Sequence, residues 1–264
     1  MKSLGSGIRS GNDIGKGQIR LEAEGERSRR ERNLWAAALA LAALAGIMVA
    51  TAIDPHLDIS LAAIFYEGAD RGFGMRSQAN LRILRELGYY LPFLVLLIAG
   101  LVLLHRMRNS RAEAALSARR FLFLALSLAL GPGLLVNGVL KEMSHRPRPS
   151  QIVEYGGISE FRPWYAVDGT CDHNCSFASG EVAGATWLVA PASLLPPPWR
   201  AVALASAGLL TLAVALLRMA FGGHFASDAA AAAWVTLGMI FAFGWLLLRR
   251  RAGPYGFDAS RPRA

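Results

Sequence analysis

Three ionisable side chains, Arg218, His224 and Asp228, fall within the eleven residues RMAFGGHFASD that follow Leu217. Long apolar runs lie on both sides, and ionisable groups at the ends of membrane-length helices are costly unless they face a partner or a substrate. His224 and Asp228 are four residues apart, hence on one face if a helix begins near Phe225. Asp228 would then accept a hydrogen bond from one ring nitrogen of His224 and leave the other nitrogen able to attack. A structural His–Asp pair that holds the helix end is the alternative.

Two further segments carry groups suited to phosphate. KEMSHRPRP contributes Lys141 and Arg148, and CSFASGE contributes Ser179 and Gly180. Arginine binds phosphate through two points and lysine acts as a point charge. A small turn that leads into a helix presents backbone N–H groups to an anion. Taken alone, Lys141 could be a snorkelling lysine and Ser179 a simple N-cap. Taken together, the three segments predict a phosphate pocket with a nucleophilic histidine.

The elements that would position this pocket are helices long and apolar enough to span a membrane. The chain has 264 residues, 53% of them hydrophobic, and its mean hydropathy is +0.33, as expected for a polytopic membrane protein. We predict an all-α fold with six transmembrane helices in a domain over 34–248. A disordered tail over 1–33 and a basic tail over 249–264 flank it. The apolar runs lie at 34–53, 89–104, 121–140, 180–195, 201–217 and 229–248, and Gly131-Pro132-Gly133 should kink the third helix.

The charges give an orientation. With six spans, 19 of the 28 Lys and Arg residues fall on the side of the two termini, which predicts that both termini are cytoplasmic. The loops 54–88, 141–179 and 218–228 then share the outer face of the cytoplasmic (inner) membrane. The net charge of +9 is explained by topology and anionic lipid head groups, so no nucleic-acid partner is expected.

The pattern K-x6-R-P, then SG, then R-x5-H-x3-D resembles the three-part signature of the type 2 phosphatidic acid phosphatase superfamily. These proteins are integral-membrane lipid phosphatases with six helices and an outward-facing site. The resemblance covers 141–228. It implies that His224 attacks phosphorus to form a phosphohistidine, that Asp228 orients it, and that no metal or cofactor is required. It also implies a set of phosphate-binding residues, which are Lys141, Arg148, Ser179, Gly180 and Arg218.

Three positions depart from the family pattern. Ala178 and Glu181 stand where the second motif usually has a proline and a histidine, and Leu217 stands where a serine usually precedes the arginine. The usual histidine is assigned to protonating the leaving group. Glu181 could do this only if protonated, which a nearby phosphate and partial burial favour. The alternatives are that the protein is impaired or that Glu181 binds an amine or hydroxyl of the substrate.

The aromatic insertion 150–176 is predicted to form an outer lid, with Trp164 and Tyr165 at the membrane interface. Cys171 and Cys175 form a local disulfide or stay as thiols, and a zinc site with His173 is the weaker alternative. The loop 54–88 could hold short interfacial helices at 59–66 and 81–87. No chemistry is evident in it, and the sequence leaves open whether it contributes to the pocket.

We therefore predict an enzyme that hydrolyses a lipid phosphomonoester or pyrophosphate, with a membrane lipid and the bilayer as its partners and no oligomeric state indicated. The NCSFASGE context resembles bacterial lipid A phosphatases of the 4′-phosphatase type. Undecaprenyl pyrophosphate, phosphatidylglycerol phosphate and phosphatidate remain alternative substrates. A transporter or a degenerate, phospholipid-binding family member is the rival from another class.

Overall fold

A computed structural model describes Gly25, Ser28 and residues 35–108 and 111–248 of the chain. The predicted tails over 1–33 and 249–264 lie, apart from Gly25 and Ser28, outside these residues. Residues 44–248 belong to one compact unit, and the account that follows concerns this unit.

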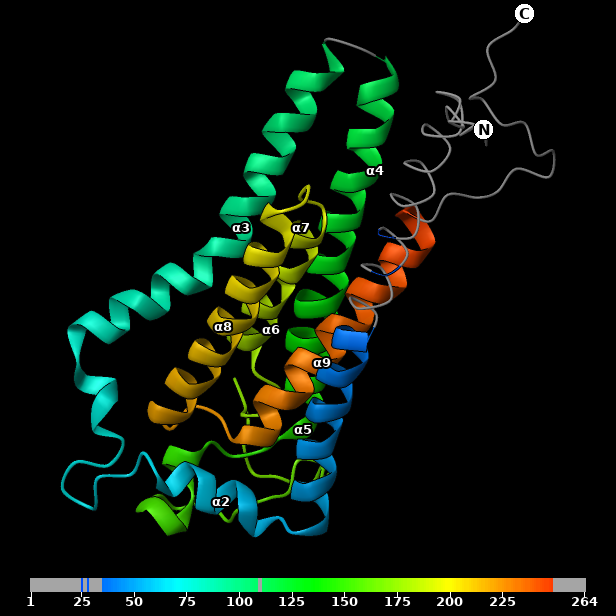
Figure 1. Ribbon diagram of the computed structural model, residues 1–264. Coiled ribbons are helices and arrows are strands. Elements are labelled where there is room, and N and C mark those ends of the chain that lie inside the picture. Colours follow the sequence, from blue (N-terminus) through cyan, green and yellow to red (C-terminus); the bar gives the residue numbers. More distant parts are fainter. Residues whose placement is uncertain (1–24, 26–27, 29–34, 109–110, 249–264) are drawn as a thin grey trace, which may run out of the picture. The chain divides into compact units, whose positions relative to one another are not determined.

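The described residues are helical and contain no β-strand, with one isolated bridge between Ile152 and Ser159. Five helical stretches are long and apolar enough to cross a membrane: Trp35–Ile53, Ala79–Met107, Ala114–Gln151, Trp199–Ala220 and Ala226–Leu248. The elements of Figure 1 are α2 (His56–Ala63), η1 (Gly74–Ser77), α3 (Ala79–Met107), α4 (Arg111–Leu128), η2 (Ala129–Leu140), α5 (Lys141–Ser144), η3 (Pro149–Gln151), η4 (Val153–Tyr155), α6 (Gly180–Trp187), α7 (Val189–Ser193), α8 (Trp199–Ala220), α9 (Ala226–Phe243) and η5 (Gly244–Leu248). The all-α class predicted from the sequence is confirmed.

The run expected at 180–195 is not one continuous helix. It is divided into α6 and α7, with a turn at Leu188. Pro191 explains the break, because it has no N–H to donate to the carbonyl of Trp187 and its ring crowds that carbonyl. The division places Pro191 in the first turn of α7, where proline is tolerated.

Three other local expectations meet the structure differently. At Gly131-Pro132-Gly133 the helix widens into the π-helix η2, and the side-chain amide of Asn137 donates to the Pro132 carbonyl at 2.8 Å. The expected separate helix at 81–87 is wrong, because these residues form the first turns of α3. The expected helix at 59–66 begins earlier, at His56, as α2.

Helix α6 is the inner element of the bundle. It packs against α9, α8, α3 and η2, and Figure 1 shows it among these helices. Small side chains make the close approach possible, since Ala183 of α6 shares one buried cluster with Ala229, Ala231, Ala232 and Ala233 of α9. The buried Trp187 indole donates to the Ser127 hydroxyl at 2.9 Å. Lipid tails offer no acceptor for this N–H group, so a partner inside the bundle is needed to satisfy it. The C-terminal end of α6 is thereby held against α4.

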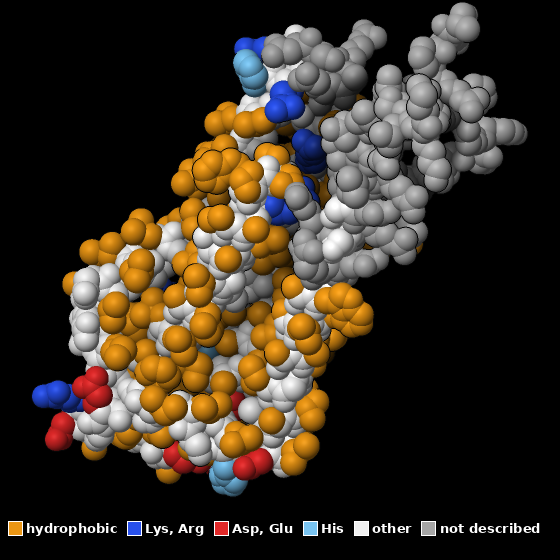
Figure 2. Space-filling view, in the orientation of Figure 1, with side chains coloured by type: hydrophobic (Ala, Val, Ile, Leu, Met, Phe, Trp, Pro, Cys, Tyr) orange, Lys and Arg blue, Asp and Glu red, His pale blue; other side chains and the backbone are white. Residues whose placement is uncertain are grey.

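Large apolar side chains cover the outside of the helices. Figure 2 shows hydrophobic side chains spread over the visible flank, with charged ones gathered toward the ends. Exposed examples on α3 and α8 are Ile83, Phe93, Leu97, Leu101, Val202, Leu209 and Leu212. A surface of this kind is stable in a bilayer and not in water, so the protein is a multi-pass membrane protein.

Candidate active site

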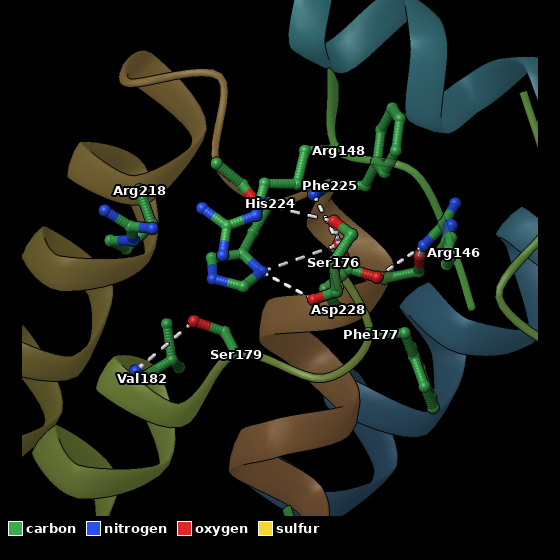
Figure 3. A network of polar contacts seen from close by, with 12 residues as sticks. Arg146, Arg148, Ser176, Phe177, Ser179, Val182, Arg218, His224, Phe225 and Asp228 are labelled. Atoms are coloured by element: carbon green, nitrogen blue, oxygen red, sulfur yellow. Dashed lines mark hydrogen bonds and ion pairs between the residues drawn. The ribbon is translucent and has the colours of Figure 1, made fainter. Parts of the chain in front are cut away.

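The three polar segments of the sequence meet at one end of the bundle. Lys141 begins α5, and Arg148 follows that helix. Ser179 and Glu181 stand at the N-terminus of α6, Arg218 in the last turn of α8, and Asp228 in the first turn of α9. Figure 3 shows the His224 ring between Arg148, Arg218 and Ser179. The predicted convergence of these residues is present.

Two glycines shape the turn between α8 and α9. Gly222 has φ +62, a left-handed conformation that glycine adopts without strain. A Cβ on Gly223 would come within 2.6 Å of Arg218 Nη2. The glycine pair therefore lets the chain turn tightly and lets the backbone lie against the Arg218 guanidinium.

His224 is held by a backbone carbonyl. Its Nδ1 lies 2.6 Å from the Ser176 carbonyl oxygen, whereas the nearest Asp228 carboxylate oxygen is 3.8 Å away. The expected hydrogen bond from the ring to Asp228 is therefore wrong in detail, because Ser176 takes that place. A carbonyl can only accept, so Nδ1 carries the proton. The opposite nitrogen, Nε2, is on the side of Ser179 and Arg218 in Figure 3.

Burial sets the protonation state of His224. The side chain is 2% exposed, and desolvation is the main cause that lowers its pKa to about 4. Arg218 adds to this effect, and Asp228 opposes it. At neutral pH the imidazole is uncharged, which is the form a nucleophile requires.

Asp228 acts on the site through other partners. One carboxylate oxygen accepts from Arg146 Nη1 at 2.5 Å, and the other accepts from the Ser176 hydroxyl at 2.5 Å and from the Phe225 amide at 2.7 Å. Because Ser176 also presents its carbonyl to His224, Asp228 positions the imidazole indirectly. The carboxylate is fully buried, which makes these compensating partners necessary.

Arg146 and Asp58 form a part of this network that the sequence did not indicate. Arg146 is fully buried and joins Asp228 to Asp58, whose carboxylate it contacts at 2.8 Å. Asp58 also accepts from the Ser227 amide at 3.0 Å. The sequence left open whether the loop 54–88 contributes to the pocket, and Asp58 joins this loop to the network. Arg146 lies between Lys141 and Arg148 in the first segment, at a position to which the motif gives no role. Asp58 lies in a mostly apolar helix with no motif around it.

The cations expected to bind phosphate lie around Nε2. Arg148 donates to the Asn174 carbonyl at 2.6 and 3.0 Å, which fixes its guanidinium. Arg218 is 6% exposed, and its Nε has no hydrogen-bond partner among the residues that the structure describes. Lys141 lies within electrostatic range of both arginines. Ser179 caps α6 by accepting from the Val182 amide at 3.5 Å, so the helix N-terminus points into the same space.

The surroundings of Glu181 favour a charged carboxylate, whereas the acid role requires the protonated form. Its carboxylate accepts two hydrogen bonds from Arg85 Nε, at 3.0 and 3.1 Å, and one from Nη2 at 2.8 Å. Arg218 Nε lies 3.6 Å away. Two neighbouring guanidinium groups favour the charged carboxylate. Arg85 lies in the 54–88 region. After Arg146 and Asp58, it is the third residue near the site that the sequence did not indicate.

The insertion 150–176 packs onto the site. Trp164 stacks on Phe177 with ring centroids 5.9 Å apart and donates to the Met48 carbonyl at 3.1 Å. Tyr165 is 53% exposed. Cys171 and Cys175 are joined in a disulfide, with a Cα–Cα distance of 5.7 Å, so they are not thiol ligands for zinc. The lid role of this segment stays a prediction.

Comparison with known proteins places this geometry in a family. Residues 120–252 match the PAP2 superfamily. The chain belongs to the PAP2 superfamily. It is 32% identical over 200 residues to a protein of Rhizobium leguminosarum named lipid A 4′-phosphatase, which covers 71% of this chain and 85% of the relative. A protein of the same name from Francisella tularensis subsp. novicida (strain U112) is 33% identical over 177 residues, which covers 67% of this chain and 79% of the relative.

No solved structure matches the chain. As a PAP2 superfamily member with relatives of this kind, the protein is a lipid phosphatase, a hydrolase of phosphoric monoesters. Among the described residues, no group of three or more His, Cys, Asp or Glu side chains is arranged to hold a metal ion. The predicted independence of metal remains to be tested.

Proposed function

We propose that the protein removes a phosphate from a lipid A-type substrate at the outer face of the cytoplasmic membrane, with His224 as the nucleophile. The observation that carries this proposal is the fixed, neutral imidazole: its Nδ1 donates to the Ser176 carbonyl at 2.6 Å, and Nε2 faces the cationic pocket. The names of the relatives from Rhizobium and Francisella support the substrate class.

The reaction proceeds in two displacements. Nε2 of His224 attacks phosphorus, the bond from phosphorus to the lipid oxygen breaks, and a phosphohistidine forms. Water then attacks phosphorus and releases inorganic phosphate, which restores the imidazole. Lys141, Arg148, Arg218 and the N-terminus of α6 hold the phosphate oxygens, and preorganised donors of this kind stabilise the charge of the transition state.

The leaving lipid oxygen needs a proton. Glu181 is the candidate donor because it stands at the N-terminus of α6 beside Arg218, at the position where the family has a histidine. It must first take up a proton, which its pairing with Arg85 opposes. If turnover by Glu181→Gln were unchanged at every pH, the donor role would be lost.

Orientation and substrate are part of the proposal. The excess of Lys and Arg on the side of the termini supports a cytoplasmic location for both ends and an outward-facing site. A cavity of about 640 Å³ lined by Leu84, Leu87 and Leu217 reaches Glu181 from between α3 and α8. Its apolar lining suits acyl chains of a lipid whose phosphate lies at His224.

The test is phosphate release by the purified protein in detergent with a chelator present. Lipid A, undecaprenyl pyrophosphate and phosphatidate are compared as substrates. We expect release from lipid A, its loss in His224→Ala, and no effect of the chelator. Release only with a divalent metal, or activity retained in His224→Ala, would contradict the histidine mechanism. Preferential phosphate release from another lipid would contradict the proposed substrate, but it would not contradict the histidine mechanism.

A further inference from the structure

The ion pair between Arg85 and Glu181 joins two elements that are far apart in the chain. Arg85 lies in the early turns of α3, and Glu181 in the first turn of α6. Three hydrogen bonds of 2.8 to 3.1 Å connect the guanidinium and the carboxylate, which is the two-point geometry that arginine also uses for phosphate. The Glu181 side chain is 14% exposed, and that of Arg85 is 35% exposed.

The Glu181 carboxylate occupies the place of an anion in the cationic pocket. Arg218 Nε lies 3.6 Å from it and has no hydrogen-bond partner among the described residues. Arg148 and Lys141 are within electrostatic range. Asp228, the other carboxylate near the site, is turned toward Arg146 and Ser176. Glu181 therefore neutralises the charge that a bound phosphate would neutralise.

Arg85 and Glu181 also line cavities in the bundle. Both residues line the cavity of about 640 Å³ between α3 and α8. Glu181 also lines a second cavity of about 290 Å³ on the other side of α3, together with Asn137 and Gly180. The pair therefore borders the larger cavity on one side and, through the contact of Glu181 with Arg218, the cationic pocket on the other.

We propose that Arg85 is a further phosphate-binding residue, and that Glu181 is an internal anion which Arg85 and Arg218 exchange for the phosphate of the substrate. A phosphate dianion carries more charge than a carboxylate and more acceptor oxygens, so it competes successfully for both guanidinium groups. The displaced carboxylate loses its partners and lies beside a like charge, which favours its protonated form. This inference rests on the proposed function, because it assigns partners to the same phosphate.

The exchange predicts shifts of opposite sign in two variants. Removing the internal competitor in Glu181→Gln should tighten the binding of inorganic phosphate about tenfold. Removing the ligand in Arg85→Gln should weaken it about tenfold or more. Arg85→Lys, which keeps the charge without the two-point geometry, should fall between Arg85→Gln and the unchanged protein.

Glu86→Gln is the matched control. Glu86 also contacts Arg85, at 3.3 Å, but its side chain is 54% exposed. Its substitution should change the phosphate affinity less than about twofold, as is typical for an exposed pair.

The measurement is titration calorimetry of inorganic phosphate into the full chain in detergent, with the melting temperature recorded for each variant. Opposite shifts support the exchange. If both substitutions weaken binding, or neither changes it, Arg85 only holds Glu181 in place and the inference is overturned. Because binding is read without turnover, the two claims separate: opposite shifts in a protein that releases no phosphate from lipids would refute the proposed function alone. A failure of Arg85→Gln to fold leaves Arg85→Lys and Glu181→Gln to decide.

Discussion

The buried bridge through Arg146 should be the most sensitive point of the end of the bundle that carries the site. Arg146→Met keeps the length of the side chain and removes the guanidinium, which contacts Asp228 at 2.5 Å, Asp58 at 2.8 Å and Ser227 Oγ at 2.9 Å. Two fully buried carboxylates would then lack their shared cation. Breaking a buried pair from one side costs about 3–5 kcal/mol, and we expect the upper end because two carboxylates are affected.

A loss of about 5 kcal/mol corresponds to a fall in melting temperature of about 10–20 °C for a chain of this size. The assay is thermal unfolding in detergent, followed by phosphate release measured well below the melting temperature. Arg162→Met is the matched control. Arg162 lies in the loop that follows Arg146, but its ion pairs join it to Glu160 and Asp168, which are 77% and 71% exposed. Exposed pairs contribute only about 0–1 kcal/mol.

A second substitution makes the reasoning sharper. In the Arg146→Met background, Asp58→Asn removes one of the uncompensated charges and should restore about 1–3 kcal/mol of stability. In the otherwise unchanged protein, Asp58→Asn should destabilise. The reasoning is refuted if Arg146→Met melts within 2 °C of Arg162→Met, or if the effect of Asp58→Asn has the same sign in both backgrounds.

Two further predictions concern His224 and the turn that carries it. Because burial lowers the pKa of His224 to about 4 from an unfolded value of about 6.5, the unfolded chain binds more protons in that window. Stability should therefore fall by about 2 kcal/mol between pH 7 and pH 5, and this difference should be absent from the unfolding of His224→Gln. Gly223→Ala places a Cβ within 2.6 Å of a guanidinium nitrogen, so KM should rise about tenfold. Gly208→Ala, where no heavy atom lies within 4 Å, should leave KM unchanged.

Local patterns were sufficient to predict the membrane bundle and most of the phosphate site. Long apolar runs can satisfy their backbone only as helices in lipid, and the motif residues are fixed by their places at helix ends. His224 and Arg218 were predicted as site residues from their place in the motif pattern, and the structure brings them close together (Figure 3). The division of α6 from α7 at Pro191 was also readable in principle, because proline removes a defined hydrogen bond.

The partners that come from distant parts of the chain could not be predicted. Asp58 meets Arg146 across 88 residues, and Arg85 meets Glu181 across 96 residues. Each of these charges stands in an apolar or mixed stretch with no local spacing that marks it. The Ser176 carbonyl that accepts from His224 could not be predicted either, because every residue has a backbone carbonyl and the residue type does not show which one is used. Only the packing of α2 and α3 against the site shows that the region 54–88 takes part in it.

The central claim is that the phosphoryl group passes through His224. The direct measurement is a single-turnover experiment with lipid A labelled in its phosphate, quenched in alkali and digested for mass spectrometry. The account predicts a phosphoryl group on the imidazole of His224 that forms before inorganic phosphate is released and is absent from His224→Ala. Complete turnover in which the label goes directly to inorganic phosphate, or resides on another side chain, would contradict it.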